Sequence, residues 1–333
     1  MDERVFKDKR KLRKRAGITR PPGFLRSLEA LERNMLDVDP PDHKRLRGLV
    51  HKAFTPRRVE QIAGRVERLA DELLAKMGES GPVDLLREYA LPIPTTVISE
   101  MLGIPASDRG RFHRWSSEIV AASSRRSPLS VLPSLVLFIR YLKKIIARKS
   151  ADPTDDLISA LVQADEASDR LDADEVLAMV FLLSPRRCGT RDNGEPHRQR
   201  VLALLQSPRE LERLRAEPGL YRTAVEELLR FGSPVEVATE RYAREPIEVA
   251  GVTIPEHALV GPVLASANRD ESQFERPDEL DVGRDPNRHL AFGDGIHFCL
   301  GAPLARLEGR IALEELLSRR RTLKLAVRES KLR

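Results

Sequence analysis

The ten residues from Phe292 to Gly301 constrain the fold of this chain more than any other part of the sequence. They place Cys299 between glycines, just ahead of a predicted helix. A thiolate that ligates a metal needs nearby N–H donors, and a helix N-terminus favours its negative charge. A backbone that passes close to a flat cofactor needs the freedom that Gly293, Gly295 and Gly301 supply. Taken alone, a buried cysteine is more often a small core residue, so the surrounding positions decide its role.

The composition is that of a folded protein of the cytosol. Hydrophobic residues make up 41% of the chain and charged residues 32%, which excludes a disordered or fibrous protein. The two cysteines, Cys188 and Cys299, exclude a disulfide framework and fit a reducing compartment. No apolar run approaches the roughly 20 residues that a membrane helix needs, and the charged N-terminus does not resemble an export signal. We therefore expect a cytoplasmic protein without a membrane span.

The net charge of +6 belongs to the start of the chain. Residues 1–20 hold nine Lys or Arg side chains and three acids, while the other 313 residues carry 48 of each sign. A basic leader can bind nucleic acid or an anionic membrane surface, and a solvated helix and loop is the plainer alternative. No nucleic-acid motif accompanies the charge, so we expect neither partner. Basic side chains between His43 and Arg58 are either solvated or a docking face for an acidic protein.

Helical periodicity dominates the pattern of apolar residues. It predicts helices over residues 59–77, 93–102, 176–183, 221–230 and 304–319. Asp172 and Glu175 form a capping-box pattern ahead of the third of these helices. Strand patterns are few and cover residues 247–249, 251–254 and 259–264. With no repeat or low-complexity linker, the sequence predicts a single mainly α domain over residues 1–333, with a small β region.

One set of positions in the cysteine turn resembles the haem-thiolate signature of the cytochrome P450 family: Phe292, Gly293, Gly295, His297, Cys299 and Gly301. Upstream, Glu227-Leu-Leu-Arg230 is similar to the family's Glu-x-x-Arg pair and lies in the family's order, 72 residues before Cys299. Residues 39–47 are similar to a helix motif of soluble bacterial members, and residues 268–270 match the stretch before the haem loop. The resemblance spans nearly the whole chain.

The resemblance implies a cytochrome P450 fold that binds haem b, iron protoporphyrin IX, with Cys299 as the axial ligand of the iron. Glu227 and Arg230 would brace the structure behind the haem. The other implied cofactor contacts are His43, Arg47, Arg241 and His297 on the propionates, and Phe292, Gly293 and Gly301 beside the macrocycle. Of the remaining histidines, we expect His51, His113 and His289 to be solvated or structural, with His289 near enough to the haem loop to touch a propionate.

The resemblance also implies a reaction class. It is monooxygenation, in which one atom of dioxygen enters a small, apolar organic substrate. A ferredoxin-type partner would supply the electrons, and the protein would act as a monomer. Nothing in the sequence identifies the substrate.

The chain departs from the family at its ends and behind the haem. It begins where the family has completed its first helix and first hairpin, and it stops at Arg333, before the family's final strands. These differences predict an incomplete cytochrome P450 fold. Near Glu279 the family often has an Arg or His that completes a triad with Glu227 and Arg230. A carboxylate at this position predicts weaker bracing.

The segment 184–200 departs most from the family. There the family continues a long central helix, in which an acid and an alcohol relay protons to oxygen. This chain instead has Pro185 and Pro196, each of which breaks a helix interior at a cost of about 3 kcal/mol or more. Thr190 and Glu195 have the wrong spacing to replace the acid and the alcohol, so no catalytic residue can be assigned. Monooxygenation is therefore expected to be impaired. The family pattern resumes at Val201.

Back-translation of residues 188–200 suggests a cause. With permitted codons, reading these thirteen codons one nucleotide later gives Ala-Gly-Arg-Glu-Thr-Thr-Val-Asn-Leu-Ile-Gly-Asn-Gly, the family's oxygen-activating helix. The degenerate bases are free to fit, but most codons are constrained at two of three positions. We hypothesise a local frameshift or a sequencing error. Two alternatives stay open: a haem protein without turnover, and a truncated product without function. Cys188 is then an accidental thiol, and no Cys-x-x-Cys pattern points to zinc.

Overall fold

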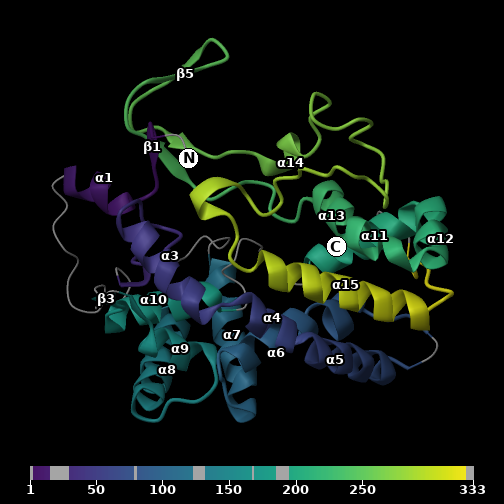
Figure 1. Cartoon of the computed structure of the whole chain (residues 1–333), viewed down its shortest axis with the longest axis horizontal. Coiled ribbons are helices and arrows are strands. Elements are labelled where there is room, and N and C mark those ends of the chain that lie inside the picture. Colours follow the sequence, from purple (N-terminus) through teal and green to yellow (C-terminus); the bar gives the residue numbers. More distant parts are fainter. Residues whose placement is uncertain are drawn as a thin grey trace.

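The computed structural model describes residues 3–15, 30–78, 81–122, 132–166, 169–184 and 195–327. Helices form most of this part of the chain (Figure 1). They are α1 (Lys9–Arg15), α3 (Asp42–Ala53), α4 (Pro56–Gln61), α5 (Ala63–Lys76), the π-helical turn η2 (Leu86–Ala90), α6 (Pro92–Met101), α7 (Ala106–Ala122), α8 (Leu132–Ala151), α9 (Leu157–Gln163), α10 (Ala173–Leu183), α11 (Glu195–Gln206), α12 (Pro208–Ala216), α13 (Tyr221–Gly232), α14 (Leu264–Ala267) and α15 (Ala302–Arg319). Two short 3₁₀ turns are η4 (Pro218–Leu220) and η5 (Gly295–His297).

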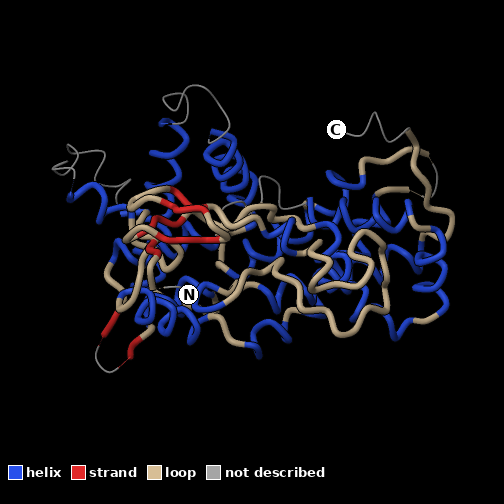
Figure 2. The backbone as a smooth tube through the Cα atoms, turned by 90° about the horizontal axis from the view of Figure 1, so that it is seen from above, coloured by secondary structure: helices blue, strands red, loops and turns tan. Residues whose placement is uncertain are grey.

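The strands are short and gather at one end of the molecule (Figure 2). An antiparallel three-stranded sheet has the order β1 (Val5–Phe6), β4 (Arg241–Ala243) and β7 (Leu259–Val260). Two hairpins pair β2 (Asp165–Glu166) with β3 (Asp169–Arg170), and β5 (Ile247–Val249) with β6 (Val252–Ile254). The predicted mainly α fold with a small β region is therefore confirmed.

Most element predictions are confirmed, and two are corrected. The helix predicted over residues 59–77 is two helices, because α4 ends and α5 begins on either side of Ile62. The strand predicted over residues 259–264 ends at Val260, two residues before Pro262, which has no N–H to donate to a sheet. Leu264 instead begins α14.

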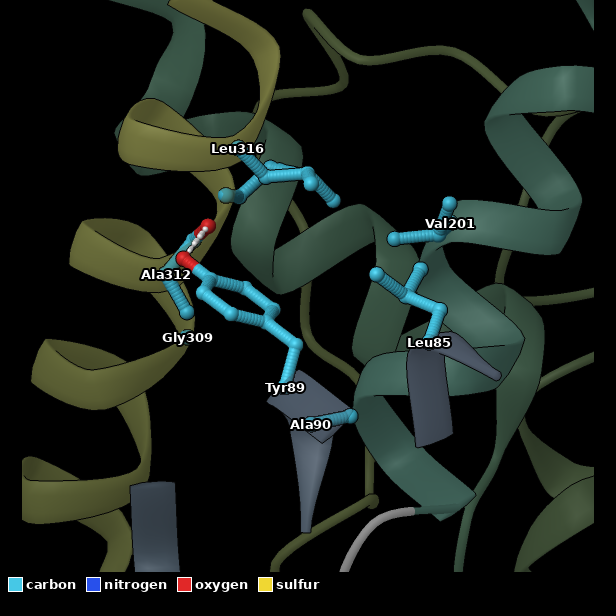
Figure 3. Close-up of a pocket in the computed structure, with 8 residues that line it drawn as sticks. Leu85, Tyr89, Ala90, Val201, Gly309, Ala312 and Leu316 are labelled. Atoms are coloured by element: carbon cyan, nitrogen blue, oxygen red, sulfur yellow. Dashed lines mark hydrogen bonds between the residues drawn. The ribbon is translucent and has the colours of Figure 1, made fainter. Parts of the chain in front are cut away.

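The long helix α15 crosses the middle of the molecule and packs against α5 and α13 (Figure 1). Its buried face includes Leu304, Ile311 and Leu316. The Tyr89 hydroxyl of η2 donates to the carbonyl of Ala312 at 2.7 Å, beside a cavity of about 10 Å³ (Figure 3). This cavity is about the smallest that can hold one water, so it leaves no room for a substrate.

Helix α10 is buried on all sides from Glu175 to Leu182 and ends one residue later. Its N-terminus has the predicted capping box, in which Asp172 and Glu175 bond reciprocally. Its C-terminus is Leu183, and Ser184 is extended and donates from its hydroxyl to the carbonyl of Phe181. The described helix thus ends two residues before Pro185, where that proline predicts a break.

The second proline lies at a helix end rather than within a helix. Pro196 is in the first turn of α11, where a missing N–H costs little. Cys188 and Thr190 lie outside the described residues.

None of the described helices is both long enough and apolar enough to cross a membrane.

Candidate functional site

The turn from Phe292 to Gly301 closes on itself. The backbone N–H of Cys299 donates to the carbonyl of Phe292 at 2.9 Å. Gly293 and Gly295 have φ angles of 71° and 69°, in the left-handed region that glycine adopts without a Cβ penalty. Gly301 has an ordinary φ of −80°, and a Cβ on it would lie 3.9 Å from Cys299 Sγ. The predicted need for backbone freedom is confirmed at Gly293 and Gly295 and is wrong for Gly301, which already leads into α15.

Cys299 is half-buried in this turn and is not part of a disulfide. Its carbonyl accepts from the N–H of Ala302, so the residue lies directly ahead of α15, at the positive end of that helix. Arg47 of α3 reaches the same turn and donates from Nη2 to the carbonyl of Phe298 at 2.8 Å. Burial lowers the pKa of Arg47, while the negative charge of a Cys299 thiolate raises it. A cation and a helix N-terminus beside one thiol favour its thiolate form.

The buried imidazole of His43 and the half-buried imidazole of His297 meet beside this turn. The rings of His43, on α3, and His297, in η5, lie 4.3 Å apart and edge-on. Neither of their buried Nε2 atoms has a hydrogen-bond partner among the described residues. Burial first, and then the positive charges of four neighbours, lower the pKa of His297 to about 2. These neighbours are Lys7, His43, Arg241 and Arg47. Buried Nε2 atoms without a partner among the described residues, surrounded by cations, favour an anionic acceptor at this position.

Five basic side chains therefore converge on this side of the turn, and we call them the basic cluster: Lys7, His43, Arg47, Arg241 and His297. Arg241 lies on β4, the middle strand of its sheet, and donates from Nη1 to the carbonyl of Thr239 at 2.7 Å. Burial lowers the pKa of Arg241. The structure thus brings together the four residues that the sequence singled out for the propionates. Lys7 was missed, because a residue beside a two-residue strand carries no periodic signal.

The Glu227–Arg230 pair is fully buried behind the turn. Arg230 donates from Nε and Nη2 to the two carboxylate oxygens of Glu227, at 2.8 Å each. Arg284 donates from Nε to the same carboxylate at 3.1 Å, and Asn287 donates from Nδ2 at 3.0 Å. The expectation of weaker bracing is therefore wrong. Arg284 thus takes the place of the Arg or His that the family often has near Glu279. The carboxylate of Glu279 instead accepts a hydrogen bond from Arg276.

Asn268 ties the same buried pair to the cysteine turn. Its Nδ2 donates to the hydroxyl of Ser233, and its Oδ1 accepts from the N–H of Leu290 at 2.7 Å. Its carbonyl accepts from Nη1 of Arg230 at 2.9 Å. Asn268 is fully buried. One residue therefore couples the end of α13, the start of the cysteine turn and the buried ion pair, through both its side chain and its backbone.

A second, partly buried network supports the aromatic residue of the turn. Glu226 accepts from Arg306 at 2.7 and 2.8 Å, and its Oε2 lies 3.0 Å from Nε2 of His289. The N–H of Ala291 donates to Nδ1 of His289, which assigns the ring proton to Nε2. Burial tends to raise the pKa of Glu226, but these two donors outweigh it and lower the pKa to about 2. The Arg306 guanidinium lies 4.8 Å from the ring centre of Phe292.

The other two histidines that were singled out differ in their surroundings. His51 is exposed on α3. The ring of His113 lies 6.2 Å from that of Phe112. His289 faces Glu226, so a structural role fits its contacts.

Comparison with known proteins agrees with the cysteine turn. The sequence profile of the family described as cytochrome P450 matches residues 215–326. Cytochrome P450 107B1 of Saccharopolyspora erythraea is 43% identical over 338 aligned positions, which cover 100% of this chain and 82% of that protein.

Solved structures are equally similar. The cytochrome P450 PksS of the Bacillus subtilis 168 bacillaene polyketide synthase superposes with a TM-score of 0.89 at 39% identity, over 98% of this chain and 81% of that one. P450BioI, solved in complex with an acyl carrier protein that carries hexadec-9Z-enoic acid, gives 0.84 at 35% identity, over 91% and 79%. On this similarity, which extends over the whole chain, the protein belongs to the cytochrome P450 family, whose members use haem b as cofactor.

Proposed function

We propose that Cys299 is the axial iron ligand of haem b in this chain, and that His43, Arg47, Arg241 and His297 hold the two propionates. The observation that carries this proposal is the pair of buried Nε2 atoms of His43 and His297, which have no partner among the described residues. Two carboxylates placed there would accept from both imidazoles and neutralise the neighbouring guanidiniums. The residues present therefore fit haem.

Each part of the site has a separate task in this proposal. Arg47 and Arg241 balance the charge of the carboxylates, while His43 and His297 donate hydrogen bonds to them. Phe292, held by Arg306, would lie against the macrocycle. Haem, when bound, supplies the iron that activates dioxygen. The chain supplies the thiolate, the orientation of the cofactor and the exclusion of water behind it.

We infer a monooxygenase whose turnover is impaired. The substrate class is small, apolar organic molecules, which is the expectation that the resemblance carries. No described residue supplies the acid and alcohol of the proton relay, because α10 ends at Leu183. The end of α10 at Leu183 also favours a second candidate function, in which the protein binds haem through a thiolate but does not catalyse monooxygenation.

Electrons would come from a ferredoxin-type protein. Exposed Lys44, Lys52 and Arg57 lie on α3 and the start of α4, near the cysteine turn. A groove of about 300 Å³ between α4, α13 and α15 is lined by Arg222, Arg306 and Arg310, together with two glutamates and apolar residues. A mainly basic face of this kind favours an acidic partner. We further propose that residues 1–333 form one monomeric domain, since one buried cluster runs from Leu31 to Leu317.

A series of measurements separates a monooxygenase from a haem protein without turnover. Purified protein loaded with haem, reduced and exposed to CO, is expected to give the red-shifted Soret band of thiolate ligation. Oxygen-dependent product from an apolar substrate, with a ferredoxin and its reductase, would then identify an enzyme. A thiolate spectrum without product identifies the passive binder. A protein that takes up no haem contradicts both functions.

A further inference from the structure

Lys7 is a buried ammonium group that uses little of its hydrogen-bonding capacity. The residue is 3% exposed, and Nζ donates to the hydroxyl of Thr239 at 2.6 Å. Among the described residues, this hydroxyl is its one side-chain hydrogen-bond partner, and no carboxylate lies within ion-pair distance. An ammonium has three N–H donors, and a buried charge without a counter-ion is costly. The surroundings of Lys7 therefore favour the binding of an anion beside its ammonium group.

The nearby acid Asp39 does not serve as this anion. Its Oδ1 accepts from the backbone N–H of Lys7 at 2.8 Å, and its Oδ2 accepts from the N–H of Asp8 at 3.3 Å. The same carboxylate pairs with Nζ of Lys11 at 2.6 Å. Asp39 thus fixes the backbone at Lys7 and takes another lysine as its ion-pair partner.

The strand register directs Lys7 to the basic cluster. Val5 pairs with Ala243 and Phe6 with Tyr242. Continuing this antiparallel register by one residue sets Lys7 opposite Arg241, and directly opposed residues project from the same face of a sheet. Both side chains bond to Thr239, Lys7 to its hydroxyl and Arg241 to its carbonyl.

The charge of Lys7 also acts on the two imidazoles of the cluster. It lowers the pKa of His43 and of His297, in each case after the larger effect of burial. Lys7 is therefore close enough to both rings for its charge to act on them.

We propose that Lys7 is a further anchor for the carboxylates of haem, a role that rests on the proposed haem site. The lysine would donate to a propionate from the sheet side, while Arg47 and His43 reach it from α3. Burial and the charge of Arg241 lower the pKa of Lys7 to about 8. A carboxylate beside the ammonium would raise this pKa again, so the bound cofactor and the charged lysine stabilise each other.

The test compares haem loss from Lys7→Met and Lys9→Met. Methionine keeps the length of the side chain and removes its charge. Lys9 is a matched control, because it lies two residues away, is 46% exposed and pairs with Glu240. Haem transfer to excess apomyoglobin, followed at the Soret band, is expected to be at least about tenfold faster from Lys7→Met than from wild type. Lys9→Met is expected to match wild type.

Two further measurements separate an anchor from a structural role. With haem dimethyl ester, which lacks both carboxylates, Lys7→Met and wild type are expected to lose cofactor at the same rate. Without haem, Lys7→Met is expected to resist urea unfolding at least as well as wild type. The reason is that the substitution removes a buried charge that has no counter-ion when the cofactor is not bound. An unchanged rate of haem loss, or the same acceleration with the ester, would overturn the role of Lys7. Failure of wild type to bind haem through a thiolate would instead refute the proposed site itself.

Discussion

Glu227 and Arg230 are both fully buried, so the stability of this ion pair depends on every group that completes it. A carboxylate has room for several donors, and Arg230 uses only part of that capacity. Arg284 and Asn287 supply further donors, and the N–H of Asp281 adds one at 3.1 Å. The bracing behind the cysteine turn is thus a shared network rather than a single pair.

Replacing Arg284 by alanine tests this network. Arg284→Ala removes a charge-assisted hydrogen bond from the buried Glu227 and is expected to lower the free energy of unfolding by about 2 kcal/mol. Urea unfolding at neutral pH measures the change. The exposed Arg288 is the matched control, and Arg288→Ala is expected to change stability by less than about 0.5 kcal/mol. Equal effects of the two substitutions would show that Arg284 does not brace the pair.

A second prediction concerns pH and Glu226. Its pKa is lowered from 4.5 to about 2 in the folded protein, so its ionised form stabilises the fold. That stability is fully present above pH 4.5 and is lost as pH falls through about 2. Glu226→Gln is therefore expected to cost about 2 to 3 kcal/mol at neutral pH. In a series of urea unfolding curves, the difference in the free energy of unfolding between Glu226→Gln and wild type should shrink below pH 4.5. A difference that stays constant with pH would contradict the stabilising role of the Glu226 carboxylate.

Among the elements, α10 and α11 carry the departure from the family. The apolar run and capping box of α10 predict its start, and Pro185 predicts its end at Leu183. Val201 lies beside Leu85 and Tyr89 of the η2 segment, so α11 joins the core where the family pattern resumes (Figure 3). The described helices α10 and α11 therefore end at Leu183 and begin at Glu195, and the family pattern is regained within α11.

Restoring this helix is expected to restore turnover. The variant replaces residues 188–200 by the thirteen residues of the shifted frame and adds Pro185→Ala, which removes the helix breaker. A positioned acid and alcohol should raise the rate of product formation at least about a hundredfold. The matched control carries Gln-Val in place of the Glu-Thr of the new stretch, and it is expected to bind haem without that gain.

Two results would contradict the frameshift hypothesis. One is a restored variant no more active than its control. The other is encoding DNA that reads through this stretch with codons unrelated to the shifted frame.

The sequence predicts the elements whose signals are local. Helices such as α13 and α15 follow from apolar periodicity over ten or more residues, and the β5–β6 hairpin follows from a short strand pattern around Gly251. The break at Ile62 interrupts an apolar pattern that continues through it, so periodicity alone does not predict it. The end of β7 at Val260 has a local cause, Pro262, which a pattern of apolar residues does not register. The sequence does not identify Arg284 as a partner of Glu227, because the two residues are 57 positions apart in the chain and no local pattern links them.

At the scale of the whole molecule, the site is assembled from the two ends and the middle of the chain. The sheet pairs β1 with β4, which brings Lys7 beside Arg241, and α3 adds His43 and Arg47. The cysteine turn closes on this group through the bond between Arg47 and Phe298. Motifs predict four of the five cluster members one by one, but only the tertiary structure adds Lys7 and shows that the Nε2 atoms of His43 and His297 have no partner among the described residues.

The most direct test of this account is the CO difference spectrum of the reduced, haem-loaded protein and of Cys299→Ser. We expect the wild type to show the red-shifted Soret band of a thiolate ligand. The serine variant, which keeps the turn and the basic cluster, should lose that band while it retains some haem. An identical thiolate band in both proteins, or none in the wild type, would contradict the assignment of Cys299.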